Sequence, residues 1–185
     1  MIDETEVVRL ACDYGDPRRL HYTLEVGPSL FLTRFQRHAD RRGEVVLALE
    51  RRDGRLVLHR KAHYREDVFR LLSGGVGHGE PVIEAVVRET EEETGLQVQV
   101  EQFVALLSYT FRFGGIDVPF VSYVFHLRET AGRFSPDWLE IDQVREVWPH
   151  QLPEVAGRLR GLDGDRADWG RWRAIAHDVV AEELG

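Results

Sequence analysis

The sequence predicts a layered α/β or α+β fold, in which strands are mixed with two or three helices. Apolar segments of strand length alternate with segments of helical spacing, and glycine-rich turns separate many of them. The 185 residues suffice for one well-packed core and are too few for two of ordinary size. We therefore expect a single domain over residues 1–185, with an N-terminal strand extension at 1–40 and the core at 41–185.

Composition argues against several classes of protein. Apolar residues make up 43% of the chain and charged residues 30%, values typical of globular rather than disordered proteins. The longest apolar stretches, around residues 45–49 and 103–107, are far shorter than the roughly 20 residues that span a bilayer. The N-terminus is acidic, whereas a secretory signal begins with basic residues. We expect a cytoplasmic protein with no membrane partner.

The charge balance indicates the kind of ligand. A net charge of −8 without a long basic run opposes binding of a nucleic acid duplex. A small phosphorylated molecule is the better candidate. An acidic protein repels such a molecule too, so we expect a bound cation to mediate the contact.

Cysteine and histidine do not predict a zinc site. Cys12 is the only cysteine, so no intrachain disulfide and no cysteine-based zinc site can form. His59 and His63 have the spacing of metal ligands only in a helix, and the residues around them indicate strand and loop.

The N-terminal extension contains two candidate strands. Residues 20–26 and 30–35 are rich in apolar and β-branched side chains, and Gly27-Pro28 between them favours a turn. We interpret both segments as strands.

A pair of strands follows. Residues 44–50 and 55–60 are apolar, and Asp53-Gly54 between them is a strong hairpin signal because both residues tolerate positive φ. The sequence therefore predicts a hairpin at this position.

The centre of the chain predicts a short strand, a glycine-rich loop and a helix. Residues 69–72 indicate the strand, which runs into the glycine-rich segment 73–79. Pro81 suits the first turn of a helix, and Gly95 suits the position just past its C-terminus. We expect this central helix to carry the chemistry.

The remaining elements are strands and then helices. Residues 97–100 and 103–113 are extended in pattern, and Gly114-Gly115 turns the chain back through 118–127. A last strand is expected at 142–148. Helical spacing then recurs in two segments, residues 152–159 and 169–184, joined by a loop at 161–165.

Three carboxylates lie together on the central helix. Glu89, Glu92 and Glu93 stand at i, i+3 and i+4, so the helical period brings them to one face. Unpaired, they repel one another, whereas a hard divalent cation turns them into oxygen ligands. A solvated acidic face in an unrelated α/β protein is the alternative, and it predicts no dependence on metal.

The surroundings of this helix favour the metal site. Gly74, Gly75, Gly77 and Gly79 precede it, and a glycine-rich segment before a helix N-terminus offers backbone amides to an anionic group.

Seven fixed residues share one spacing pattern: Gly74, Glu80, Arg88, Glu89, Glu92, Glu93 and Gly95. With Leu96 after them, they resemble the signature of the Nudix hydrolase family at every fixed position. Thr90 is the one departure, because the family pattern has an apolar residue there. We expect Thr90 to pack against the sheet. The resemblance implies an α/β fold, the family's α/β/α sandwich with a mixed β-sheet, over most of the chain and least of all over residues 1–40.

The resemblance also implies roles for the carboxylates. Glu89, Glu92 and Glu93, helped by Glu80, would hold Mg²⁺ or Mn²⁺, and Arg88 would orient them by ion pairing. A hard cation on oxygen ligands neutralises diphosphate charge and lowers the pKa of bound water, while a glutamate accepts its proton. In-line attack on phosphorus then needs positioning and charge stabilisation.

Further site residues are expected outside these carboxylates. Many family members take another carboxylate from a loop before the last strand, and Glu140 is the first candidate, followed by Glu146. A surface position is the alternative for either residue. Gly74, Gly75 and Arg70 are the expected contacts to substrate phosphate.

The resemblance predicts an enzyme that hydrolyses the diphosphate bond of a nucleoside diphosphate linked to another moiety. ADP-ribose or a related ADP-linked compound is the first expectation, by analogy with family members that have an N-terminal strand extension. The alternative is a non-catalytic Nudix-fold module that binds a nucleotide as a sensor. A homodimer built partly from residues 1–40 is also possible.

Overall fold

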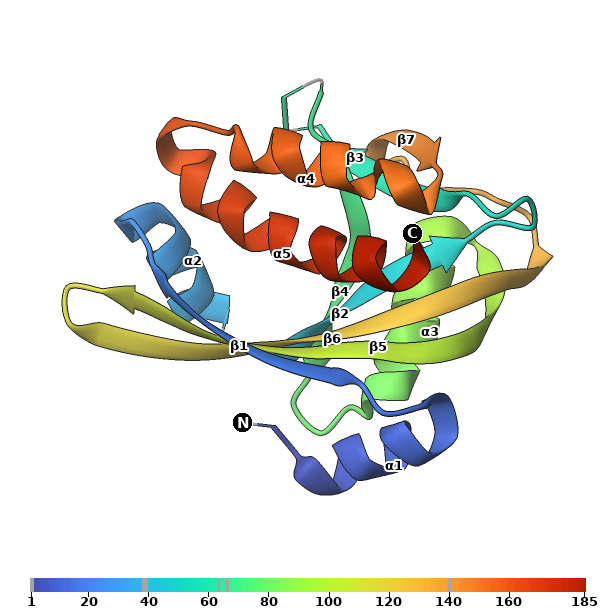
Figure 1. The fold of residues 1–185 in the computed structure, drawn as a ribbon, viewed down its shortest axis with the longest axis horizontal. Helices are drawn as coiled ribbons and strands as arrows, with labels where there is room; N and C mark the ends of the chain where they lie inside the picture. The colour runs from blue at the N-terminus through green and yellow to red at the C-terminus, as the bar shows by residue number, and fades with distance from the viewer. Residues whose placement is uncertain (1, 38–39, 63, 66, 140) are drawn as a thin grey trace.

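The structure is a computed structural model that describes residues 2–37, 40–62, 64–65, 67–139 and 141–185 (Figure 1). Its elements, in chain order, are α1 (Glu4–Tyr14), β1 (Arg18–Glu25), α2 (Pro28–Arg37), β2 (Arg41–Glu50), β3 (Leu56–Lys61), β4 (Arg70–Gly77), α3 (Val82–Thr94), β5 (Leu96–Phe113), β6 (Ile116–Gly132), β7 (Ile141–Val147), α4 (Leu152–Arg160) and α5 (Ala167–Leu184), with short 3-10 helices at Pro149–Gln151 and Gly164–Arg166. No helix among these residues is both long and apolar enough to cross a membrane.

The strands form one mixed sheet. Their order is β1-β5-β6-β2-β4-β3-β7. β1 runs parallel to β5, and β2 runs parallel to β6, while the other neighbours are antiparallel. Parallel neighbours need long connections, and here each connection contains α3 together with several strands. The predicted α/β class with a mixed sheet is confirmed.

Helices cover both faces of this sheet (Figure 1). Along β2, Val46 and Ala48 join the apolar core under α2, α4 and α5. Their neighbours Val45 and Leu47 join a second core under α1 and α3. Because successive strand residues point to opposite faces, β2 is apolar almost throughout and is buried on both sides. The fold is an α/β/α sandwich, as expected.

The central helix has the predicted ends. Pro81 is its N-cap residue, and Gly95 ends it in the left-handed conformation, with φ 68°, which favours glycine. Thr90 is fully buried, and its hydroxyl donates a hydrogen bond of 2.7 Å to the carbonyl oxygen of Val86. The hydroxyl is therefore satisfied within the helix, and the methyl group is free to pack.

The predicted strand at residues 30–35 is wrong, because this segment belongs to α2. Pro28 occupies the first helical position, which suits its fixed φ. Leu30 and Phe31 pack into the core beneath α5, and the Asp168 carboxylate on α5 accepts a hydrogen bond from the amide of Gly27. Contacts with a distant helix thus favour the helical state.

The sequence interpretation also missed α1. Asp3 caps this helix, and its carboxylate accepts hydrogen bonds from the amides of Thr5 and Glu6 at 2.9 and 3.2 Å. An N-cap aspartate followed three residues later by glutamate is a recognised helix start. This pattern was the signal that could have revealed α1.

The hairpin prediction is half right. The turn forms, with the amide of Arg51 donating to the carbonyl oxygen of Arg55 at 2.8 Å. However, β2 and β3 pair only at Glu50 and Leu56, because β4 lies between the two strands over the rest of their length. β4 is also longer than expected and includes most of the glycine-rich segment.

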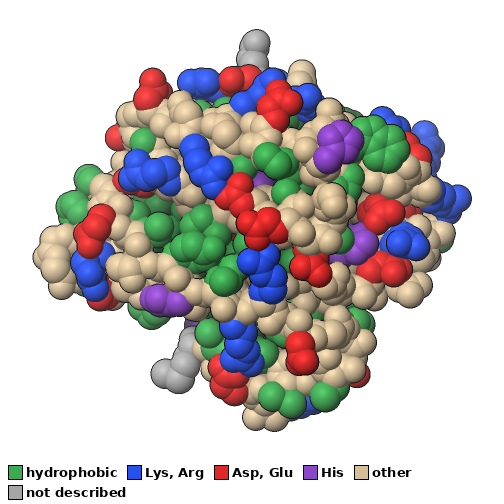
Figure 2. Space-filling view, viewed as in Figure 1, with side chains coloured by type: hydrophobic (Ala, Val, Ile, Leu, Met, Phe, Trp, Pro, Cys, Tyr) green, Lys and Arg blue, Asp and Glu red, His purple; other side chains and the backbone are tan. Residues whose placement is uncertain are grey.

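The C-terminal half follows the prediction more closely. β5 is one strand of 18 residues rather than two, and its pairing with β6 shifts register near residue 101 and again near residue 104. Such bulges bend a strand without ending it. The last strand and both C-terminal helices lie where their patterns predicted them. Figure 2 shows acidic and basic side chains interspersed over the face that carries α4 and α5.

Candidate functional site

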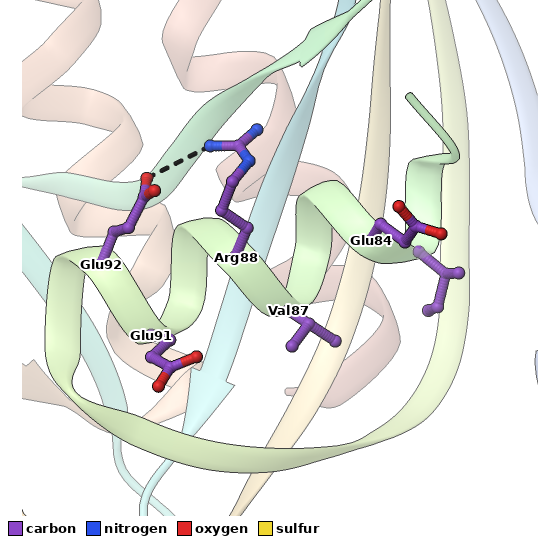
Figure 3. A pocket seen from close by; sticks show the side chains of 6 residues that line it. Glu84, Val87, Arg88, Glu91 and Glu92 are labelled. Atoms are coloured by element: carbon purple, nitrogen blue, oxygen red, sulfur yellow. Dashed lines mark hydrogen bonds and ion pairs between the residues drawn. The ribbon is translucent and has the colours of Figure 1, made fainter. Parts of the chain in front are cut away.

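One arginine draws three of the predicted site carboxylates together. The Arg88 guanidinium on α3 donates to Glu80 and Glu89 at 2.8 Å each and to Glu92 at 3.2 Å. Figure 3 shows the Glu92 side chain directed toward Arg88, with Glu91 on another side of the helix. The three carboxylates therefore lie within reach of a single positive charge, as the resemblance implied for Arg88.

Glu80 and Arg88 stabilise each other's charges. The Arg88 hydrogen bond holds the pKa of Glu80 below its usual value, and the amide of Gly77 assists this effect with a hydrogen bond of 2.7 Å. The hydrogen bond with Glu80 in turn raises the pKa of Arg88. Both groups keep their charges because each stabilises the ionised form of the other.

The glycines of β4 allow this approach. A Cβ atom on Gly74 would lie 1.7 Å from Cδ of Glu89, so only glycine leaves room for that carboxylate. A Cβ on Gly75 would lie 2.7 Å from Cζ of Arg41, and the carbonyl oxygen of Gly75 accepts a hydrogen bond of 2.9 Å from Arg88. Gly74 and Gly75 thus stand in a strand beside the carboxylates, where a loop with exposed amides was expected.

Glu93 points away from this cluster. Its side chain is buried, with 8% exposed, and it faces β3 instead of the surface that holds Glu92. His59 of β3 is fully buried beside it, with Nδ1 at 3.8 Å from Oε1 of Glu93. The helical period placed the three glutamates on neighbouring positions, but the structure separates an inner carboxylate from two outer ones.

Arg70 does not face solvent. It is buried, and its guanidinium donates to the hydroxyl groups of Tyr64 at 3.1 Å and Ser73 at 2.7 Å. These hydrogen bonds connect the Arg70 side chain to neighbouring residues at the start of β4. A contact between Arg70 and substrate phosphate stays a prediction.

Of the two candidates near the last strand, the structure describes Glu146. Glu140 lies outside the described residues. Glu146 on β7 forms ion pairs with Arg51 and Arg55 at 2.7 and 2.8 Å, which links β7 to the turn after β2.

The N-terminus of α3 already has an anionic partner. Glu6 of α1 accepts a hydrogen bond of 2.7 Å from the amide of Val82 and pairs with Arg42 at 2.8 Å. A carboxylate at a helix N-terminus satisfies an amide that has no partner within the helix. The amide of Val82 is therefore satisfied by the protein itself, and an anionic ligand at this terminus stays a prediction.

A hollow of about 270 Å³ adjoins the cluster and is lined by Asp40, Arg41, Gly75, Gly77, Glu80, Arg88 and Glu89. Arg41 was missed in the sequence. Its Nε atom is buried and makes no hydrogen bond within the described part of the chain. The adjacent arginines directly before a buried strand were the available signal. This hollow combines a cationic group with carboxylates, which suits a phosphate ligand that binds together with a metal ion.

The donor set fits a hard divalent cation. Such cations prefer carboxylate oxygens, and Glu80, Glu89 and Glu92 already converge on one positive group. Among the described residues, no three acidic, histidine or cysteine side chains are arranged to hold a metal, because Arg88 holds the outer carboxylates and Glu93 points inward. The residues therefore fit such a cation in two respects: their donor atoms are carboxylate oxygens, and Gly74 leaves space for the carboxylate of Glu89.

Comparison with known proteins identifies the fold family of this region. The family profile described as the NUDIX domain matches residues 40–170. This match covers well over half of the chain and includes β2 to α4.

Curated relatives share part of their length with the chain. An NAD-capped RNA hydrolase NudC from Photorhabdus laumondii is 31% identical over 113 residues, which are 59% of this chain and 42% of the relative. A protein of the same name from Stutzerimonas stutzeri is 27% identical over 121 residues, 65% of this chain and 42% of the relative. The chain therefore matches less than half the length of these relatives.

Solved structures resemble the fold. A NUDIX hydrolase from Nitrosomonas europaea superposes with a TM-score of 0.52 at 16% identity, over 78% of this chain and 90% of the other. A UDP-X diphosphatase superposes with a TM-score of 0.50 at 20% identity, over 99% of this chain and 73% of the other. At such identities the likeness is evidence for the fold alone.

Proposed function

The chain belongs to the Nudix family, and on this basis we propose that it hydrolyses the diphosphate bond of a nucleoside diphosphate linked to another moiety, with Mg²⁺ or Mn²⁺. The observation that carries the proposal is the convergence of Glu80, Glu89 and Glu92 on Arg88. The inner carboxylate, Glu93, follows Glu92 directly in the sequence. A protein that only binds a nucleotide has no need for so many acidic groups at one place.

In this proposal the carboxylates and Arg88 have different roles. Glu89, Glu92 and Glu93, with Glu80, would hold the divalent cation, which neutralises diphosphate charge and lowers the pKa of bound water. Arg88 orients Glu80 and the outer carboxylates through its hydrogen bonds.

Glu93 is the proposed general base. Its side chain is buried and faces His59 of β3, on a different side of the helix from the carboxylates that pair with Arg88. A water oxygen attacks phosphorus, its proton passes to a glutamate, and the bond to the bridging oxygen breaks. This displacement depends on positioning and charge stabilisation more than on a protein nucleophile.

An ADP-linked compound is the proposed substrate. The curated relatives are named for NAD-capped RNA, and NAD contains ADP joined through its diphosphate to a second nucleoside. Arg41 at the hollow beside the carboxylates offers a cation to the diphosphate. We therefore place ADP-ribose, NAD and similar molecules first.

A panel of substrates tests the function. ADP-ribose, NAD and UDP-glucose are incubated with Mg²⁺, Mn²⁺ or a chelator, and a phosphatase converts the monophosphate products to inorganic phosphate for detection. We expect metal-dependent turnover, fastest for the ADP-linked compounds, and none with the chelator. Absence of turnover, together with thermal stabilisation by ADP-ribose, would support the non-catalytic sensor instead.

The homodimer also stays a proposal. Apolar residues of the N-terminal segment, such as Val7 and Leu10, pack into the chain's own core, whereas Val8 is exposed. Light scattering during size-exclusion chromatography measures the molar mass directly, and a mass of one chain would contradict the dimer.

A further inference from the structure

His59 is a polar side chain placed where an apolar one would be expected. It lies in β3, is completely buried, and neither ring nitrogen makes a hydrogen bond to any residue that the structure describes. Burying a polar group without a partner costs free energy, which an apolar residue of similar size would avoid. Packing alone therefore does not explain a histidine at this position.

The ring faces the inner carboxylate. Nδ1 of His59 lies 3.8 Å from Oε1 of Glu93, about 1 Å beyond hydrogen-bond distance. Within enzymes, hydrogen bonds used in catalysis are often long without ligand and tighten in the substrate complex. A small rotation of either side chain would bring the two atoms together.

The imidazole can donate a hydrogen bond without carrying a charge, because its neutral form has one N–H group. Unlike a lysine or arginine, it can orient a carboxylate while leaving the full negative charge for a metal ion or a proton.

His177 provides an internal comparison. It is also buried, and burial lowers its pKa to about 3. However, its Nε2 accepts a hydrogen bond of 3.0 Å from the amide of Leu71, and its Nδ1 lies 2.8 Å from the carbonyl oxygen of Arg173. The Nε2 bond joins β4 to α5, and the Nδ1 contact lies within α5. Both ring nitrogens of His177 thus have partners, whereas neither nitrogen of His59 has a hydrogen-bond partner among the described residues.

We propose that His59 is a positioning residue for Glu93: its ring donates the Nδ1–H hydrogen bond that orients this carboxylate when the site is loaded. The inference rests on the proposed function, because Glu93 is there a metal ligand and general base. Groups that hydrogen-bond to ligating carboxylates commonly change metal affinity or activity about 10–100-fold when removed.

Two substitutions of equal branching test the role. His59→Asn keeps an N–H donor at the position of Nδ1, and His59→Leu has the same shape without a donor. Dissociation of Mn²⁺ is measured from the electron paramagnetic resonance signal of unbound Mn²⁺, and kcat and KM are measured on the best substrate of the panel. We expect His59→Leu to weaken Mn²⁺ binding or kcat about tenfold or more, with a smaller change in KM, and His59→Asn to restore most of the loss.

Thermal unfolding separates positioning from a structural role. His59→Leu should leave Tm unchanged or raise it, because it removes an unsatisfied buried group, whereas His177→Leu should lower Tm. Equal Mn²⁺ affinity and equal kcat in wild type and His59→Leu would overturn the inference, as would equal losses in His59→Leu and His59→Asn. Wild-type protein that binds Mn²⁺ but hydrolyses nothing would contradict the proposed function only, and the Mn²⁺ comparison would still decide the role of His59.

Discussion

Glu6 and Val82, far apart in the sequence, are joined by a hydrogen bond of 2.7 Å from the amide of Val82 to the carboxylate of Glu6. The bond ties α1 to the first turn of α3, the helix that carries the site carboxylates. The Arg42 guanidinium reinforces this contact, since it pairs with Glu6 and also donates to the carbonyl oxygen of Glu80 at 2.6 Å. A segment outside the Nudix signature thus helps to place the helix that contains it.

Removing this contact should destabilise the protein. Glu6→Ala leaves the Val82 amide without its acceptor and the largely buried Arg42 without its carboxylate partner, so we expect the free energy of unfolding to fall by about 1–2 kcal/mol. Urea denaturation measures the change. Glu4→Ala is the matched control on the same helix, because its ion pair with Arg19 is more than half exposed and contributes little. Equal losses for both variants would argue against the capping role of Glu6.

Gly74→Ala should damage the site more than the fold. Its Cβ would overlap Cδ of Glu89, so the carboxylate must move, and we expect activity to fall about tenfold or more. The loss of stability should not exceed about 1–3 kcal/mol, the usual cost of overpacking. Gly157→Ala is the control, since no atom lies within 4 Å of its Cβ position in α4. That change should stabilise the helix by about 0.5–1 kcal/mol.

The glutamates of α3 should differ in importance. Glu93→Gln and Glu92→Gln should each lower kcat by about 100-fold or more, the scale of general base and ligand loss, with the circular dichroism spectrum unchanged. Glu91→Gln should change kcat little, because Glu91 is exposed and points away from Arg88 and Glu92 (Figure 3). Similar losses at all three positions would contradict the assignment of the site to Glu92 and Glu93.

A buried ion pair should contribute strongly to stability. Glu44 and Arg173 lie 2.8 Å apart with side chains 5% and 10% exposed, and the hydroxyl of Ser122 donates to the same carboxylate at 2.7 Å. Arg173→Met leaves a buried charge without its partner, so we expect a loss of about 3–5 kcal/mol in the free energy of unfolding.

The control for this pair lies on α4. Arg158 and Glu154 form an exposed pair, and Arg158→Met should change stability by no more than about 0.5 kcal/mol. Denaturant titration compares the two variants, and a small effect for Arg173→Met would mean that water reaches Glu44.

Stability should fall with acid as His177 titrates. Burial lowers the pKa of this residue from 6.5 to about 3, so between these values the unfolded chain binds a proton that the folded chain does not. The contribution of His177 is therefore complete above pH 6.5 and declines as the pH falls, by about 1.4 kcal/mol per unit at most. Chemical denaturation at pH 7, 6, 5 and 4 measures this slope, and His177→Gln should make it shallower. An unchanged slope in the variant would show that other groups cause the decline.

Much of the site could be predicted because its residues lie on one helix. The period of an α-helix brings positions three and four apart together whatever the rest of the fold does, so the grouping of Arg88 with Glu89 and Glu92 followed from their spacing alone. The ends of α3 followed in the same way, since Pro81 and Gly95 act through their own backbone geometry. A part of the site that is formed by residues close together in the chain can therefore be predicted from the sequence.

Longer-range features were not accessible from spacing. Residues 30–35 form a helix whose residues Leu30 and Phe31 pack into the core. β4 lies between β2 and β3, and Arg41 lies against Gly75 at the site. The sequence by itself determined the family signature, the alternation of strands and helices and the single helix that bears the carboxylates. Only the tertiary structure decided that Glu6 caps that helix, that Glu93 points inward and that His59 lies beside it, because these contacts join residues whose separation along the chain carries no periodic signal.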